Sequence, residues 1–315
     1  MDRQVLIQAE HLYHHYGSLC AVADLSFELA KGEVLGFLGP NGAGKSTTMR
    51  MLTGNLAPSH GRVRVNGIDL LDHPREAKRE LGYLPEQPPL YRELTVDEYL
   101  GYCARLHRMP RARIARAVAL AKERCGLGPV GRRLIGNLSK GYQQRVGIAQ
   151  AILHNPAVVI LDEPTVGLDP IQIREIRHLI RELGETHGII LSTHILPEVQ
   201  GTCNRVQIIH QGRLVFNDSM QGLERRMQAK AVIAAFRQPP GEAELAAIPG
   251  VDQVEDLGNG RYRLSGHDEN PAEAVADRAA AGGWGLTELI PERRTLEQIF
   301  VELTTRDAAA EDEAA

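Results

Sequence analysis

Residues 39–47 have the types and spacing that bind nucleotide phosphates. They read Gly-Pro-Asn-Gly-Ala-Gly-Lys-Ser-Thr and fit the pattern G-x-x-x-x-G-K-[ST] in full. The glycines let successive backbone N–H groups face one point, and a helix that begins at about Lys45 adds the partial positive charge of its N-terminus. Lys45 would reach the β- and γ-phosphates, and the Ser46 hydroxyl would bind Mg²⁺. The alternative is a glycine-rich turn without a ligand. The predicted nucleotide-binding residues of this segment are Gly39, Asn41, Gly42, Ala43, Gly44, Lys45, Ser46 and Thr47.

Two adjacent carboxylates form the second group of residues that could do chemistry. The apolar run 158–161 leads directly into Asp162 and Glu163. Asp162 would help Ser46 to hold Mg²⁺ at the phosphates. Glu163 would act as the catalytic base that polarises the attacking water. An acidic strand end is common in any protein, so the pair gains its meaning from the phosphate loop.

Short apolar runs are expected to position these residues. Residues 34–38, 158–161 and 189–192 read as buried strands, and they alternate with helical patterns as in an α/β domain with a mainly parallel sheet. A helical subdomain is expected at about 90–155. It contains a capping box that begins at Thr95 and an amphipathic helix at 111–125.

The composition excludes several classes of protein. The formal net charge is −4, so no global basic surface indicates nucleic acid, although a local basic patch remains open. The four cysteines are scattered, which is not typical of a zinc site or a disulfide framework. No apolar run approaches the roughly 20 residues that a membrane helix needs. Any role at a membrane is therefore expected to go through a partner chain.

The pattern changes after about residue 222. The ranges 232–236, 261–264 and 285–290 read as strands, and 242–248, 272–281 and 296–303 read as helices. This order predicts a small C-terminal accessory domain over 223–305, of the α+β, ferredoxin-like type. Residues 306–315 are rich in Ala, Asp and Glu and are expected to form a flexible tail. The first domain is predicted to span 1–222.

Kinases, GTPases and motor ATPases also have a phosphate loop followed by a carboxylate strand. Residues 138–145 discriminate between these classes, and they read Leu-Ser-Lys-Gly-Tyr-Gln-Gln-Arg. This segment resembles LSGGQ, the signature motif of the ATP-binding cassette (ABC) ATPases. The form LSKGY resembles exporter ATPases of the gliding-motility, cytochrome-maturation and drug-efflux type. The resemblance covers about residues 4–220, and the ending at 295–304 resembles the accessory domain of the same ATPases. It implies an α/β P-loop NTPase fold of ABC type. The implied signature residues, which act across a dimer, are Ser139, Lys140, Gly141, Tyr142 and Gln143.

The resemblance also assigns roles to several isolated residues. It implies that Tyr16 stacks on the adenine of ATP, that Asp169 belongs to the D-loop, and that His194 is the catalytic switch histidine. The family's Q-loop glutamine is replaced by Glu86, and Gln87 follows it. Either residue could approach ATP, and Gln87 could approach Mg²⁺, so the two alternatives stay open.

The implied function is ATP hydrolysis with Mg²⁺ by two copies bound head to tail, which power a multi-span membrane permease. An accessory substrate-binding subunit is a further candidate partner, and nucleic acid is not expected. The implied location is the cytoplasmic face of a bacterial inner membrane. Two rival readings are a cassette ATPase of chromosomes, DNA repair or ribosomes, and a regulatory module without turnover. The first lacks the expected coiled-coil arms or tandem cassettes, and Glu163 and His194 argue against the second.

Overall fold

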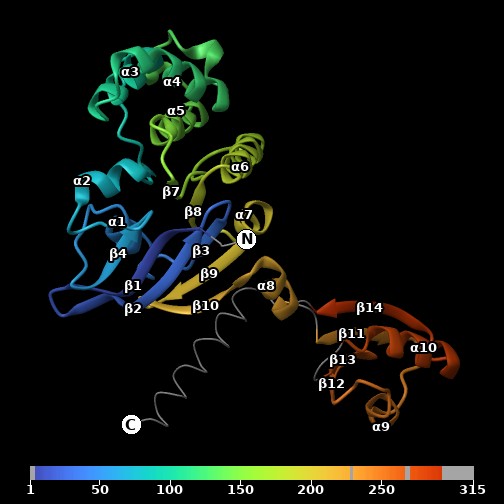
Figure 1. Ribbon diagram of the computed structural model, residues 1–315. Coiled ribbons are helices and arrows are strands. Elements are labelled where there is room, and N and C mark those ends of the chain that lie inside the picture. Colours follow the sequence, from blue (N-terminus) through green and yellow to red (C-terminus); the bar gives the residue numbers. More distant parts are fainter. Residues whose placement is uncertain (1–3, 228–229, 267–269, 293–315) are drawn as a thin grey trace. The chain divides into compact units, whose positions relative to one another are not determined.

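The structure is a computed structural model that describes residues 4–227, 230–266 and 270–292. The chain divides into two compact units, Met1–Met220 and Gln221–Ala315. The predicted helix at 296–303 and the predicted tail at 306–315 lie outside the described residues. Figure 1 shows the order of the elements along the chain.

A six-stranded sheet forms the centre of the first unit. Its strand order is β10-β9-β3-β8-β7-β6, and every pair is parallel except β10 with β9. Every residue of β3, β7 and β8 is buried, as expected for parallel strands covered on both faces. The strands are β3 (Val34–Leu38), β6 (Leu81–Leu84), β7 (Val158–Asp162), β8 (Gly188–Thr193), β9 (Arg205–His210) and β10 (Arg213–Ser219).

A second, antiparallel sheet of the same unit has the order β2-β1-β4-β5. Its side chains share one hydrophobic core with the central sheet, in which Leu12, Phe37 and Met49 are fully buried. The strands are β1 (Val5–Tyr16), β2 (Leu19–Ala30), β4 (His60–Val65) and β5 (Ile68–Asp69).

The helices of the first unit include the predicted helical subdomain. Thr95 caps α3 with the predicted capping box, because its hydroxyl accepts from Glu98 N and the Glu98 carboxylate accepts from Thr95 N. Along α4, the partly or fully buried positions Ile114, Val118 and Ala121 form one stripe. The helices are α1 (Lys45–Leu52), α2 (Pro74–Ala77), α3 (Val96–Leu106), α4 (Arg111–Arg124), α5 (Lys140–Ile152), α6 (Pro170–Gly184), α7 (Leu196–Thr202) and α8 (Met220–Met227), the last of which begins where the first unit ends.

The second unit has the element order β-α-β-β-α-β, which is that of ferredoxin-like domains. The strand order β12-β13-β11-β14 is antiparallel throughout. Val232, Phe236 and Trp284 belong to a core of its own. The predicted fold class is confirmed, but the sequence analysis missed one strand, β12. The elements are β11 (Ala231–Phe236), α9 (Glu242–Ala246), β12 (Gln253–Gly258), β13 (Arg261–Ser265), α10 (Ala272–Gly282) and β14 (Leu286–Glu292).

Candidate functional site

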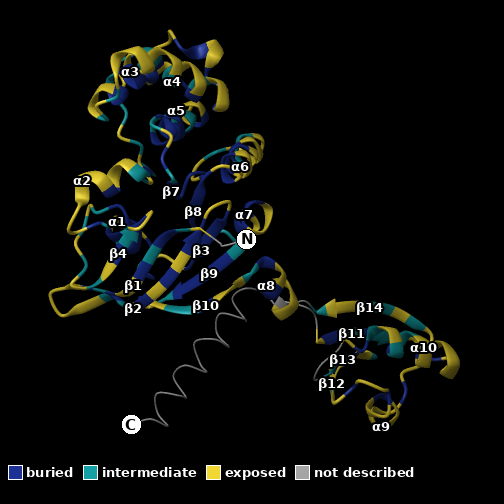
Figure 2. Cartoon of the chain, viewed as in Figure 1, coloured by how far each residue is buried: buried dark blue, intermediate teal, exposed yellow. Residues whose placement is uncertain are grey.

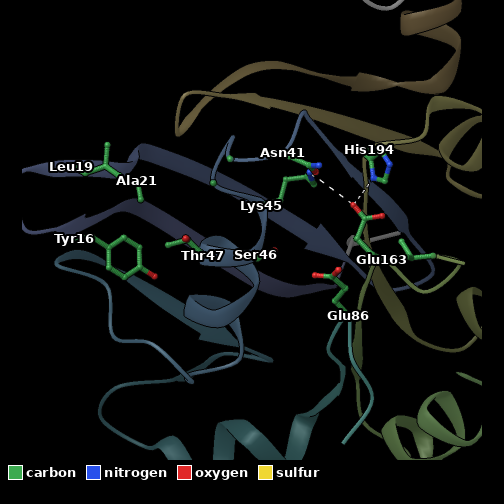
Figure 3. Close-up of a pocket in the computed structure, with 13 residues that line it drawn as sticks. Tyr16, Leu19, Ala21, Asn41, Lys45, Ser46, Thr47, Glu86, Glu163 and His194 are labelled. Atoms are coloured by element: carbon green, nitrogen blue, oxygen red, sulfur yellow. Dashed lines mark hydrogen bonds and ion pairs between the residues drawn. The ribbon is translucent and has the colours of Figure 1, made fainter. Parts of the chain in front are cut away.

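An open pocket of about 510 Å³ lies beyond the carboxyl ends of β3, β6, β7 and β8. In an α/β sheet this edge is the usual place for a ligand. Most of the predicted nucleotide-binding residues line it, as Figure 3 shows. The lining residues are Tyr16, Leu19, Ala21, Asn41, Gly42, Gly44, Lys45, Ser46, Thr47, Glu86, Glu163, Val166 and His194.

The phosphate loop follows β3 and ends where α1 begins at Lys45. Gly44 has φ +104°, and a Cβ placed on it would lie 2.6 Å from the carbonyl oxygen of Ala21. A Cβ on Gly39 would lie 2.5 Å from the carbonyl oxygen of Ile209. Only glycine fits these two positions. Gly39 and Ala43 do not line the pocket, so they shape the loop from behind it.

Lys45 is held inside the loop. Its ammonium donates to Gly39 O at 2.7 Å and to Pro40 O at 3.1 Å. Burial lowers the pKa of Lys45, while the carboxylates of Glu163 and Asp162 act in the opposite direction. An anion arriving in the pocket would therefore find a positioned positive charge.

Glu163 and His194 come together because they follow neighbouring parallel strands, β7 and β8. Glu163 Oε1 lies 2.9 Å from His194 Nδ1 and 4.0 Å from Lys45 Nζ. Burial raises the pKa of Glu163, and His194 and Lys45 oppose that shift. Glu163 Oε2 is buried and has no hydrogen-bond partner among the described residues.

The backbone of Glu163 is also unusual. Its φ is +49°, a conformation that costs free energy for a residue with a side chain, and it is fixed by a hydrogen bond from Glu163 N to Ser192 O at 2.9 Å. Strain of this kind concentrates at functional sites, where the surrounding structure holds it. It directs the carboxylate toward the phosphate loop (Figure 3).

A divalent cation would fit beside Asp162. Its Oδ1 is buried without a hydrogen-bond partner among the described residues. Burial raises the pKa of Asp162, and the nearby carboxylate of Glu86 adds to the shift, while the hydroxyls of Ser192 and Ser46 oppose it. The donors at this position are the carboxylate of Asp162 and the hydroxyl of Ser46, which are the hard oxygen ligands that Mg²⁺ prefers.

Glu86 and Gln87 are the two alternatives for the Q-loop role. Glu86 lines the pocket and Gln87 does not. The carboxylate of Glu86 acts on the pKa values of Lys45 and Asp162, which places it electrostatically within the site.

Tyr16 lies at the pocket rim, where an adenine ring would need a flat partner. It is 46% exposed and makes an edge contact with His14, with ring centroids 4.6 Å apart. Leu19 and Ala21 of β2 line the same end of the pocket, and Leu19 is 65% exposed. Sequence reasoning missed these two residues, because a Leu and an Ala in a strand carry no chemical signal.

The signature residues do not line this pocket. Ser139 is the N-cap of α5, and its hydroxyl accepts from Tyr142 N at 3.4 Å. Gln143 is turned inward, where its amide donates to Leu138 O at 3.0 Å. A Cβ on Gly141 would lie 2.6 Å from the side chain of Gln172, so the start of α5 packs closely on α6.

The D-loop lies against the signature segment of the same chain. A Cβ on Gly167 would clash with the ammonium of Lys140, so the lysine side chain packs directly against this glycine. Asp169 is the N-cap of α6 and accepts from Ile171 N at 3.0 Å and Gln172 N at 2.9 Å. The signature segment thus packs on the loop that contains Gly167, and that loop reaches the pocket through Val166.

A buried carboxylate behind the pocket was not predicted. Glu198 of α7 is 2% exposed and accepts hydrogen bonds from Thr165 Oγ1 at 2.5 Å and Thr193 Oγ1 at 2.8 Å. Thr165 follows Glu163 by two residues, and Thr193 precedes His194. Glu198 therefore braces the two segments that carry the candidate catalytic pair.

Comparisons with known proteins agree with this geometry. A sequence model of the family described as ABC transporter matches residues 22–166. The linearmycin resistance ATP-binding protein of Bacillus subtilis is 32% identical over 307 residues, which cover 96% of this chain and 99% of that protein. A Nod factor export ATP-binding protein of Rhizobium johnstonii is 33% identical over 297 residues, which cover 93% of this chain and 92% of that protein.

A solved structure of the ATP-binding subunit of an ABC transporter has a similar fold. The TM-score is 0.64 at 33% sequence identity, and the match covers 70% of this chain and 92% of that one. Within the described residues, no helix combines the length and the apolar character needed to cross a membrane.

Proposed function

The chain belongs to the ATP-binding cassette (ABC) transporter family as an ATP-binding, ATP-hydrolysing subunit, and from this we propose that it powers export by ATP-driven closure of a head-to-tail dimer. Subunits of this family dimerise and work with membrane permeases. Export is supported by relatives whose names refer to resistance and to Nod factor export.

The observation that carries the proposal is the approach of Glu163 to both His194 and Lys45 at the phosphate loop. Glu163 Oε1 lies 2.9 Å from the histidine and 4.0 Å from the ammonium. With ATP bound, the phosphates would attract Lys45, and Glu163 would be free to orient and polarise a water for attack on the γ-phosphate. His194 would contact the γ-phosphate and hold Glu163 in place.

Magnesium is proposed as the metal cofactor, held by Ser46 and Asp162 beside Glu86. The buried Asp162 oxygen that lacks a partner supports this assignment. Mg²⁺ would neutralise charge on the β- and γ-phosphates. Asp162 and Ser46 would orient it, while Lys45 binds the phosphates from the other side of the loop.

A second copy is proposed to complete the site. Ser139 lies at the N-terminus of the 13-residue helix α5, where a side-chain hydroxyl and backbone N–H groups can bind a phosphate, but it does not line the pocket of its own chain. In a head-to-tail dimer, Ser139, Lys140 and Gly141 of one copy would face Lys45 of the other. ATP would then hold the two copies together, and hydrolysis would release them.

The membrane partner is proposed to be a multi-span permease, with the chain on the cytoplasmic face of a bacterial inner membrane. An exposed aromatic group beside the Q-loop supports a docking role. Tyr91 is 47% exposed, and its ring lies 5.6 Å from that of Tyr102. An accessory substrate-binding subunit is a further proposed partner.

Glu163→Gln tests the proposed function. The change keeps the shape of the side chain and removes the charge that polarises water, so ATP turnover should fall by roughly 10²-fold or more. ATP binding should persist, and light scattering should detect dimers that accumulate with ATP. Glu185→Gln, at an exposed position after α6, is the matched control and should leave turnover unchanged. Wild-type turnover in Glu163→Gln would refute the assignment of the base.

A further inference from the structure

Charge is distributed unevenly along the chain. Residues 91–154, which include α3, α4 and α5, contain 12 Lys or Arg and 4 Asp or Glu residues, a formal net charge of +8. The whole chain has a net charge of −4, so the other residues together carry −12. The proposed ATPase cycle does not explain this separation, because the ATP pocket takes only one residue, Glu86, from near this segment.

The positive charge is most concentrated from the end of α3 into α4. Residues 105–116 contain five arginines and no acidic residue. All five side chains belong to exposed residues, and Figure 2 shows exposed positions along α3 and α4. The arginines are Arg105, Arg108, Arg111, Arg113 and Arg116; with Leu106 and Leu120 they are called the arginine surface below.

The arginines of this surface are not neutralised by the chain itself. In the part of the chain that the structure describes, none of the five forms an ion pair, whereas Lys122 pairs with Asp97 at 2.5 Å and Arg145 with Glu175 at 2.6 Å. Like charges at helical spacing repel one another and destabilise the helix. An anionic partner would remove that repulsion, and the planar guanidinium group suits phosphate oxygens in particular.

Two exposed leucines indicate which anionic partner fits. Leu106 is 63% exposed between Arg105 and Arg108, and Leu120 is 49% exposed one turn after Arg116 on α4. Cationic side chains combined with protruding aliphatic ones are typical of surfaces that rest on the headgroup layer of a membrane. A nucleic-acid backbone would engage the arginines but would leave the leucines without an apolar partner.

We propose that the arginine surface binds the anionic phospholipid headgroups of a membrane. The contact would hold the helical subdomain against the bilayer and would orient the ATPase beside its permease. None of the residues of the arginine surface lines the ATP pocket. The inference is therefore independent of the catalytic assignments, and either can fail without the other.

Vesicle flotation with the full-length chain tests the proposal. The chain should float with vesicles of phosphatidylcholine that contain roughly one third phosphatidylglycerol, and much less with pure phosphatidylcholine. Binding should weaken as salt rises toward about 1 M, because the Debye length then falls to about 3 Å. Equal binding to both kinds of vesicle would overturn the proposal.

Two matched triple variants separate the arginine surface from net charge. Arg105→Gln, Arg113→Gln and Arg116→Gln together should weaken binding by about 100-fold, since each basic residue near an anionic surface contributes roughly a factor of five. The control changes the exposed residues Arg75, Arg79 and Arg181 to Gln, which alters the net charge equally, and it should bind as the wild type does. ATP affinity should be unchanged in both variants, which verifies their fold.

A binding competition addresses the other class of partner. Double-stranded DNA and RNA oligonucleotides are titrated against the vesicle-bound chain. If an oligonucleotide bound more tightly than the anionic vesicles, and the first triple variant abolished that binding, the surface would be a nucleic-acid site and the lipid proposal would be wrong. Equal loss of vesicle binding in the two triple variants would also overturn it.

Discussion

The two units of the chain differ in whether their polar side chains have partners within the chain. In the first unit, Asp162 Oδ1 and Glu163 Oε2 are buried beside the phosphate loop and have no hydrogen-bond partner among the described residues. In the second unit, Arg263 pairs with Glu292 at 2.7 Å and with Glu255 at 3.5 Å, and Arg261 pairs with Glu288 at 3.1 Å. In residues 230–266 and 270–292, no buried side-chain polar atom lacks a partner.

This difference indicates where ligands act. A buried polar atom without a partner costs the folded state free energy, roughly 1–3 kcal/mol for an ordinary group. Beside the phosphate loop, a bound ligand could satisfy them. Surface charges that pair with one another need no further partner and contribute little to stability. The first unit is thus prepared for chemistry, while the described residues of the second unit satisfy their polar groups among themselves.

Among the variants that change ATP binding, Lys45→Ala should have the largest effect. The substitution removes the ammonium that the loop carbonyls hold at 2.7 and 3.1 Å. ATP affinity should fall by roughly 10- to 100-fold, because hydrogen bonds to charged groups contribute about 1.5–3 kcal/mol. Fluorescent-nucleotide titration measures the change, with Lys31→Ala as an exposed control. Unchanged affinity in Lys45→Ala would contradict the phosphate-loop assignment.

Glu198→Gln should have the next largest effect. The amide has one acceptor oxygen where the carboxylate has two, so Thr165 and Thr193 can no longer both donate to this side chain, and one of the two hydrogen bonds must reverse or break. ATP turnover should fall about 10-fold while the KM for ATP changes little, because Glu198 positions the catalytic pair without touching the nucleotide. A rise in KM with normal turnover would show that Glu198 does not act in this way.

A smaller effect concerns the stability of the site without nucleotide. Burial raises the pKa of Glu163, so its ionised form destabilises the folded state at neutral pH. That penalty is fully present above the folded-state pKa and disappears as the pH falls below the unfolded value. Glu163→Gln should therefore stabilise the chain at pH 7.

Thermal unfolding as a function of pH measures this gain. It should shrink as the pH falls toward the ordinary glutamate pKa of 4.5. A gain that stays constant across the acid range would mean that burial of the charge is not its cause.

The smallest effect is expected from removal of the second unit. A chain that ends at Met227, the last residue of α8, keeps every residue that lines the pocket. Its ATP affinity should stay within roughly a factor of two of the full-length value, since distant sites behave independently. Isothermal titration of both chains measures this. A soluble, folded truncation that fails to bind ATP would mean that the second unit contributes to the ATP site, and the contrast between the two units would be wrong.

Most of the pocket lining was predictable because each motif is contiguous in sequence and directly follows a buried strand. The phosphate loop, the carboxylates after β7 and His194 after β8 all follow buried strands, and parallel strands bring their carboxyl ends to one edge. The brace at Glu198 could not be predicted, because its partners precede it by 33 and 5 residues and only the packing of α7 brings them together. The positive φ of Glu163 also has no sequence signal.

The missed strand β12 has a physical explanation. Its sequence, Gln-Val-Glu-Asp-Leu-Gly, lacks the apolar alternation of a half-buried strand, and no residue in it is fully buried. It lies at the edge of the sheet, where it pairs with β13 alone. Backbone pairing and the Glu255–Arg263 ion pair hold it, and neither can be recognised from local sequence.

The carbonyl oxygens of Ile209 and Ala21, which lie close to Gly39 and Gly44, also affect the thermodynamics of ATP binding. Because the chain behind the loop leaves no room for even a methyl group at these positions, the loop keeps its shape before any nucleotide arrives. Ordering a flexible loop of this length would cost about 1 kcal/mol or more per residue in conformational entropy. A loop that is already ordered avoids that cost, so more of the energy of its phosphate contacts is available as ATP affinity.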